Sequence, residues 1–155
     1  MVKNLQKGFT LIELLVVVAI IGVLSAVVLN QLSGARDRSA DFTVKTNLAS
    51  IIGQAEIWRG ENSGKYRRDA NPTTVSNVAT CSLPNTIFVD PSITKIFTDI
   101  IASTASIITC AISGSGFEWA ISATLKDNKV WCIDNTVQGK VVTSGILTNP
   151  TVKCS

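Results

Sequence analysis

The sequence predicts an α+β fold in which a long N-terminal α-helix packs on a C-terminal antiparallel β-sheet. Three observations indicate this class: an apolar run near the N-terminus, a helical repeat of apolar residues after it, and alternating apolar residues in the C-terminal half. The chain has 155 residues, a length that suits one domain with an additional element. We expect the first half of the long helix to span a membrane.

The apolar run over residues 9–29 is long enough for a membrane helix. Residues 14–29 carry no charge, and a helix needs about 20 residues to cross the hydrocarbon core. Glu13 lies inside the run, where a carboxylate is costly, so it is a functional candidate that needs a partner. The run contains no Lys or Arg, and we therefore expect the partner to come from elsewhere. The alternative is a secretory signal peptide cleaved near the small residues 33–35.

The helical pattern continues beyond the apolar run, so one helix is expected from about Phe9 to about Arg59. Stop signals follow at Gly60, Asn62 and Gly64. We interpret the apolar stripe in the second half of this helix as core packing. The stripe, at steps of three and four, consists of Val44, Leu48, Ile51, Ala55 and Trp58.

The segment 61–85 is polar and contains Pro72 and Pro84, so it predicts a long connecting loop. Its pair Arg67–Arg68 is interpreted as solvated. A second helix is expected after Asp90, a good N-cap residue, with Pro91 at its first position. The apolar face of this helix is formed by Ile93, Ile96, Phe97, Ile100 and Ile101.

Three strands are expected in the C-terminal half, joined by turns into an antiparallel meander. The first, 117–125, alternates apolar and polar residues, the second is 130–135 and the third 139–144. In the first strand, one face is expected to carry Phe117, Trp119, Ile121, Ala123 and Leu125.

Composition argues against an enzyme. The chain has no histidine, which removes the commonest general base and metal ligand. It also has no phosphate-binding glycine loop and no nucleophile elbow. Asp127 and Asp134 do not have the spacing of an EF-hand calcium loop. We therefore expect no catalytic residue, no metal and no cofactor. The net charge of +3 is too small to indicate nucleic-acid binding through bulk charge.

The four cysteines, Cys81, Cys110, Cys132 and Cys154, indicate two disulfides in an oxidising compartment. That compartment places the C-terminal part outside the cell membrane and the N-terminus in the cytoplasm. Four cysteines allow three connectivities. We favour Cys81–Cys110, which closes the ends of the second helix, and Cys132–Cys154, which ties down the last residues. Cys81–Cys154 with Cys110–Cys132 is the competing pairing.

The stretch "KGFTLIELLVVVAIIGVL" resembles the N-terminal signal of type IV pilins and the related pseudopilins. The resemblance covers roughly the first twenty-five residues and rests on a basic leader ending in Gly8, then Phe9 and a glutamate at the fifth position, Glu13. It implies that residues 1–8 are a leader, that a prepilin peptidase cuts between Gly8 and Phe9, and that the Phe9 amine is methylated. It also implies that residues 9–29 are the half of the helix that spans the membrane and mediates assembly, and that residues 30–155 form an extracytoplasmic head.

The resemblance implies a role for the buried acid. In this family the glutamate faces the positive N-terminal amine of a neighbouring subunit, so Glu13 is expected to pair with the Phe9 amine of another copy. The implied partners are other pilin subunits in a homopolymer, the prepilin peptidase, the lipid bilayer before assembly, and an inner-membrane platform with its ATPase. The implied location is a single-pass precursor in the inner membrane and then an extracellular filament.

Three functions follow from the sequence. The first is a structural subunit of a type IV pilus, polymerising through its hydrophobic helix. The second is the major pseudopilin of a type II secretion or competence system. The third is a monomeric membrane-anchored binding domain, which the Gly8–Phe9 junction disfavours. The two disulfides favour a filament outside the cell.

Overall fold

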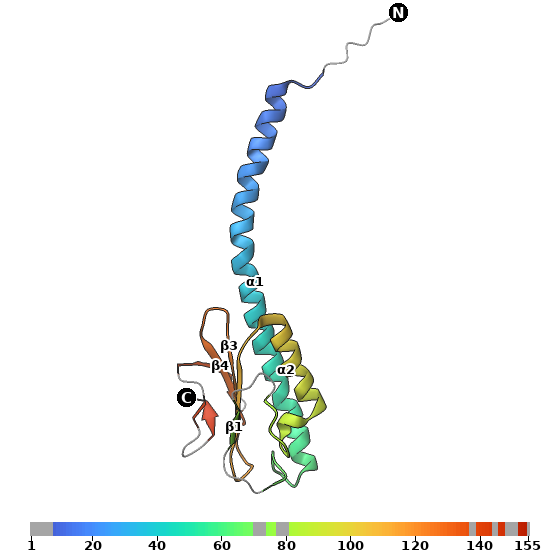
Figure 1. Ribbon diagram of the computed structural model, residues 1–155, viewed down its shortest axis with the longest axis vertical. Coiled ribbons are helices and arrows are strands. Elements are labelled where there is room, and N and C mark those ends of the chain that lie inside the picture. Colours follow the sequence, from blue (N-terminus) through green and yellow to red (C-terminus); the bar gives the residue numbers. More distant parts are fainter. Residues whose placement is uncertain are drawn as a thin grey trace, which may run out of the picture. The chain divides into compact units, whose positions relative to one another are not determined.

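The computed structural model describes residues 8–69, 74–76, 81–136, 139–143, 146–147 and 152–154. It divides into two compact units, Met1–Arg36 and Asp37–Ser155, which we describe in turn (Figure 1). The expected leader falls outside the described residues apart from Gly8. Together, the long N-terminal helix and the antiparallel sheet confirm the α+β class predicted from the sequence.

The elements follow one another along the chain in an order that places the long helix first and all the longer strands last. They are α1 (Leu11–Glu61), β1 (Thr74–Ser76), η1 (Ile87–Val89), α2 (Pro91–Thr104), β2 (Ile108–Ile112), β3 (Trp119–Thr124), β4 (Val130–Asp134), β5 (Lys140–Val142), β6 (Ile146–Leu147) and β7 (Lys153–Cys154).

Helix α1 has the length that the sequence predicts, with ends within two residues of the expected ones. At its C-terminal end, Gly64 adopts a positive φ of 77°, and its N–H donates to the Arg59 carbonyl at 3.0 Å. The Asn62 side chain donates to the Trp58 carbonyl at 2.8 Å. These bonds satisfy carbonyls that the end of a helix leaves without partners, which is the usual function of a glycine in the left-handed region.

The core of the second unit lies between a helical layer and one face of the sheet. All five residues of the predicted α1 stripe are buried, Val44 completely and Trp58 to 8% exposure. Helix α2 begins as predicted, with the Asp90 carboxylate accepting from the Ser92 N–H at 2.9 Å and Pro91 at the first position. Its residues Ile93, Phe97 and Ile100 join the same core.

The sheet has five antiparallel strands in the order β1-β2-β3-β4-β5, so each strand pairs with its neighbour in sequence. The prediction of three strands was incomplete. Strand β2 was not expected, and β1 lies inside the segment assigned as a loop. Phe117 was assigned wrongly to the strand, because β3 starts at Trp119 and Phe117 is 55% exposed. Strand β3 therefore begins two residues later than the alternation of apolar residues from position 117 predicts.

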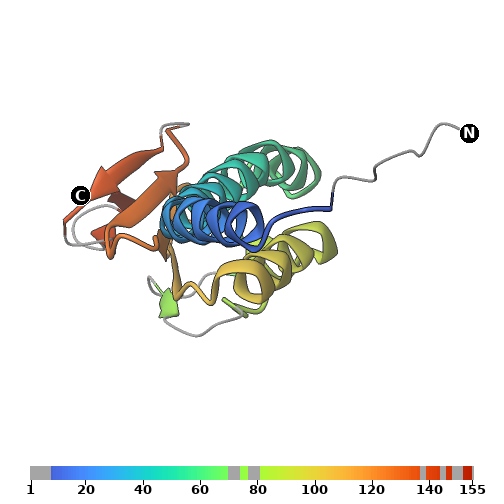
Figure 2. The same ribbon diagram turned by 90° about the horizontal axis from the view of Figure 1, so that it is seen from above.

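Both faces of the central strand β3 are buried. Trp119, Ile121 and Ala123 face the helices, whereas Ala120 and Ser122 face the other side. The second face is covered by the C-terminal residues, because Val152 packs on Ala111 and Ala120. Figure 2 shows the second unit from above, with the helices and the C-terminal strands on opposite sides of the sheet. Two small alanines at paired positions, Ala111 opposite Ala120, leave room for this third layer.

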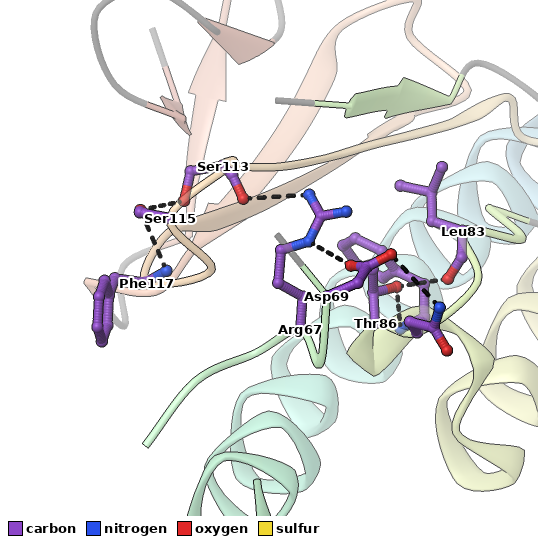
Figure 3. A network of polar contacts seen from close by, with 9 residues as sticks. Arg67, Asp69, Leu83, Thr86, Ser113, Ser115 and Phe117 are labelled. Carbon is purple, nitrogen blue, oxygen red and sulfur yellow. Dashed lines mark hydrogen bonds and ion pairs between the residues drawn. The ribbon is translucent and has the colours of Figure 1, made fainter. Parts of the chain in front are cut away.

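Arg67 corrects the expectation that the pair Arg67–Arg68 is solvated. Its side chain is only 3% exposed, and it bonds Asp69 at 2.8 Å through Nε and the Ser113 carbonyl at 3.3 Å through Nη1. Asp69 also accepts from the Asn85 side chain at 3.3 Å. Figure 3 shows how this network joins the segment after α1 to the turn between β2 and β3. A buried charge needs such partners, and the sequence did not show them because they lie far along the chain.

Candidate functional site

The predicted processing junction is accessible. Gly8 and Phe9 precede α1, and the Phe9 side chain is 82% exposed. A Cβ at Gly8 would meet nothing within 4 Å apart from its chain neighbours, so no other described residue covers the junction. An extended, uncovered peptide bond is what a peptidase requires.

Glu13 lies in the first turn of α1, where it caps the helix. Its Oε2 accepts from the Thr10 backbone N–H and from the Thr10 Oγ1, both at 2.8 Å. In return, the Thr10 Oγ1 accepts from the Glu13 N–H at 3.3 Å. This reciprocal arrangement is a capping box. It gives the carboxylate partners within its own chain, and the spacing T-x-x-E in "TLIE" is the sequence signal for it.

Residues 11–29 of α1, in the N-terminal unit, form an apolar helix whose side chains are exposed all round. The most apolar window of α1 has a mean hydropathy of 2.9 with none of it buried, which is long and apolar enough to cross a membrane by length and composition. The exposed residues include Leu15, Ile20, Val23 and Val28, each more than half exposed. Such a surface is unstable in water and needs lipid or other protein around it.

The structure brings the cysteines together as Cys81 with Cys110 and Cys132 with Cys154, with Cα separations of 5.8 Å and 5.7 Å. The first pair is completely buried in the core, with Cys110 on β2. The second lies on the outer face of the sheet beside Val142. Both Cα separations fit a disulfide. Whether the cells form these two bonds remains a prediction.

Comparison with known proteins identifies the N-terminal segment. Residues 3–29 match the family model described as the prokaryotic N-terminal methylation motif. The N-terminal segment is that of a type IV pilin or pseudopilin. The motif contains the Gly8–Phe9 junction and Glu13, so all the residues of the predicted processing and assembly site fall inside the match.

Three relatives show the range of the similarity. The chain is 44% identical over 57 residues to the type IV wide pilus major component PilA4 of Thermus thermophilus, covering 37% of this chain and 44% of the relative. It is 34% identical over 58 residues to the type II secretion system core protein G of Klebsiella pneumoniae, covering 37% and 41%. It is 69% identical over 29 residues to the type IV major fimbrial protein FimA of Dichelobacter nodosus, covering 19% of each.

The chain therefore spans less than half the length of the curated relatives that it matches. No solved structure matches it significantly.

Sequence reasoning missed several carboxylates that hold the head together. Asp134 is 5% exposed and accepts from the Thr136 N–H at 2.9 Å and the Cys154 N–H at 3.0 Å. Glu118 accepts from the Val152 N–H at 3.1 Å, and Asp41 from the Lys126 N–H at 2.7 Å. Asp134 had been weighed only as a calcium ligand, whereas here it binds backbone. Within the described part of the chain, no group of three acidic or cysteine side chains could hold a metal.

Proposed function

We propose that this chain is the structural subunit of a type IV pilus, which polymerises through the N-terminal half of α1. The observation that carries the proposal is the fully exposed apolar surface of the N-terminal unit within the match to the methylation motif. Lipid surrounds this surface before assembly, and neighbouring copies surround it in the filament. Lipid tails are as apolar as these side chains, so close van der Waals packing between helices, not apolar burial, drives the exchange of lipid for neighbouring copies.

In the proposed pathway, residues 1–8 are removed by a prepilin peptidase on the cytoplasmic side, and the Phe9 amine is methylated. Residues 9–29 span the inner membrane, with residues 30–155 outside. An inner-membrane platform and its ATPase then move the subunit into the filament. Cleavage matters because it creates the positive amine at Phe9 that a buried acid can recognise.

Glu13 has one oxygen available for that amine. Oε2 is used by Thr10, whereas Oε1 makes no hydrogen bond to any described residue. The carboxylate can therefore keep its helix cap and accept the Phe9 ammonium of a neighbouring copy at the same time. This supports a role in docking, because a charge pair surrounded by apolar side chains is screened little by water.

The second candidate is the major pseudopilin of a type II secretion or competence system. The observation in its favour is the similarity to the Klebsiella pneumoniae core protein G, whose coverage is close to that of the pilus component. Both proposals share the same processing and membrane end, and both make the protein structural rather than enzymatic.

The experiment that separates them is mechanical shearing of cells that produce this chain at its natural level. A pilus subunit is recovered in long surface filaments, with an N-terminal peptide that begins at methylated Phe9. A pseudopilin stays with the cell envelope although it carries the same mature N-terminus. A mature chain that begins at Arg36 would instead support the signal-peptide alternative and reject both.

A further inference from the structure

The solvent side of α1 in the second unit carries no charge along its centre. Opposite the buried stripe, exposed positions recur at steps of three and four. We call them the outer face: Phe42, Thr46, Ala49, Gly53 and Ile57. Phe42 is 70% exposed and Ile57 58%. A surface helix normally presents charged and polar residues to water on this side, and a helix that is apolar on two opposite sides is usually buried on both.

Among the described residues, neither the backbone conformation nor the packing around Gly53, at the middle of the outer face, requires a glycine. A Cβ at this position would meet nothing within 4 Å, and its backbone is ordinary α-helix. Glycine is a poor helix former because it loses the most backbone freedom. Glycine also allows another backbone to come very close. Such an approach from outside the chain would explain a glycine that the helix itself does not require.

We propose that the outer face is a second contact surface between copies of this chain, on which a neighbouring subunit packs in the filament. The proposal rests on the proposed function, and it names residues of the head that take part in assembly. Phe42 and Ile57 are the apolar anchors at the two ends. Thr46, Ala49 and Gly53 form the low surface between them, where a neighbouring backbone can come close.

Two observations select a second copy as the occupant. First, the outer face lies on the helix whose N-terminal half is proposed to polymerise, so identical helices are already brought alongside one another. Second, its ends carry opposite charges: Arg38, one turn before Phe42, and Glu61, one turn after Ile57, are both exposed. Subunits that leave a membrane in one orientation are parallel, and parallel copies shifted along the axis bring Glu61 of one towards Arg38 of the next.

The test uses the full chain in a strain with the complete assembly machinery. Ala49→Leu and Gly53→Leu fill the low surface, and Ala102→Leu places the same side chain on an exposed position of α2 as the matched control. We expect the two outer-face variants to lower the yield of sheared filaments at least tenfold, while the control equals wild type. The melting temperature in detergent should be at or above wild type for Gly53→Leu, because leucine is a better helix former than glycine. It should change little for Ala49→Leu and Ala102→Leu, because alanine and leucine are both good helix formers.

A photo-crosslinking amino acid at position 42 identifies the occupant directly, with position 102 as the control. We expect an adduct of two copies from position 42 in intact filaments and none from position 102. An adduct with a different protein, or filaments that form normally without any adduct, would overturn the inference. If wild type forms no filaments at all, it is the proposed function that fails. Normal filaments from Ala49→Leu and Gly53→Leu reject only the outer face.

Discussion

Tyr66 illustrates how one buried polar group links the end of α1 to the core. Its Oη donates to the Glu56 carboxylate, and its ring meets Trp119 edge-on with centroids 6.1 Å apart. Burial is the main cause that raises its pKa to about 12, and the Glu56 carboxylate adds to it. The folded chain therefore holds the phenol in its neutral form at pH values where an ordinary tyrosine ionises.

We expect the head to lose stability as the pH rises from about 10 through about 12. The folded pKa lies above the ordinary value of 10.0, so the stabilisation is fully present below that value and is lost as the pH passes the folded pKa. Tyr66→Phe should remove this part of the pH dependence and, at neutral pH, cost about 1–2 kcal/mol for the lost hydrogen bond. Because the chain has a single tyrosine, its absorbance titration reads this pKa directly. A titration midpoint near 10 would contradict the prediction.

Gly116 is a second residue whose surroundings determine which side chain the position tolerates. It has a φ of 77°, and a Cβ there would lie 2.7 Å from the Cγ of Arg67. Gly116→Ala should therefore cost about 1–2 kcal/mol for the left-handed backbone and more for displacing the buried Arg67. Gly64→Ala is the matched control, because Gly64 has the same φ with nothing within 4 Å. Denaturant unfolding of both variants measures the difference, and equal losses would show that Arg67 moves aside freely.

At the scale of elements, the last described residues form a layer on the sheet. Val152 is 1% exposed, the carboxylates of Glu118 and Asp134 accept from the Val152 and Cys154 N–H groups, and β7 pairs with β6. One disulfide, that of Cys132 with Cys154, holds the same segment. The sheet thus depends on residues distant in sequence to cover its outer face.

We expect Cys154→Ser to destabilise the head by about 3 kcal/mol, since the bond closes a loop of 22 positions. The residues around β7 should then exchange amide hydrogen faster, while α2 keeps its protection. Cys81→Ser is the comparison, and it should loosen α2 instead. Non-reducing peptide mapping checks the pairing beforehand: a linked peptide with Cys110 and Cys132 would contradict the arrangement in the structure.

The helices were predictable because their signals are local. Asp90 with Pro91, and Gly64 after a stripe of apolar residues, fix ends within one or two positions. Strands β1 and β2 were missed for the opposite reason. Strand β2 lies in "SIITCAIS", which has apolar residues on both faces because the C-terminal segment covers the outer one. Its pattern therefore lacks the alternation that marks a strand with one solvated face.

The candidate site divides in the same way. The order of Gly8, Phe9 and Glu13 is a linear motif, so the sequence was enough to find it. The cap between Thr10 and Glu13 is equally local, but its partner is a neutral side chain and backbone, not the charged group that the buried acid led us to expect. The network of Arg67 and the backbone bonds of Asp134 join distant segments. No single-sequence pattern specifies such pairs, since they depend on how the strands align.

At the scale of the whole molecule, Glu13 is expected to distinguish insertion from assembly. Glu13→Val should insert into the membrane stably, because it removes a carboxylate from the apolar segment. It should nevertheless give few filaments in a strain without other copies of the chain, since the Phe9 amine of a neighbour loses its partner. Quantifying this chain in membranes checks the insertion, and quantifying it in sheared filaments checks the assembly. Glu13→Asp should give a filament yield between those of wild type and Glu13→Val. A normal filament yield from Glu13→Val would contradict the charge pairing.

The two cysteine bridges also determine how far a loaded head can lengthen. In the proposed filament, tension would reach the head through its helix, and unfolded chain extends by at most about 3.3–3.6 Å per residue. The bridges join positions separated by 29 and 22 residues, so they withhold roughly 100 Å and 75 Å of contour length. In the proposed filament, a head that yields to force would therefore lengthen by that much less for as long as both bridges hold.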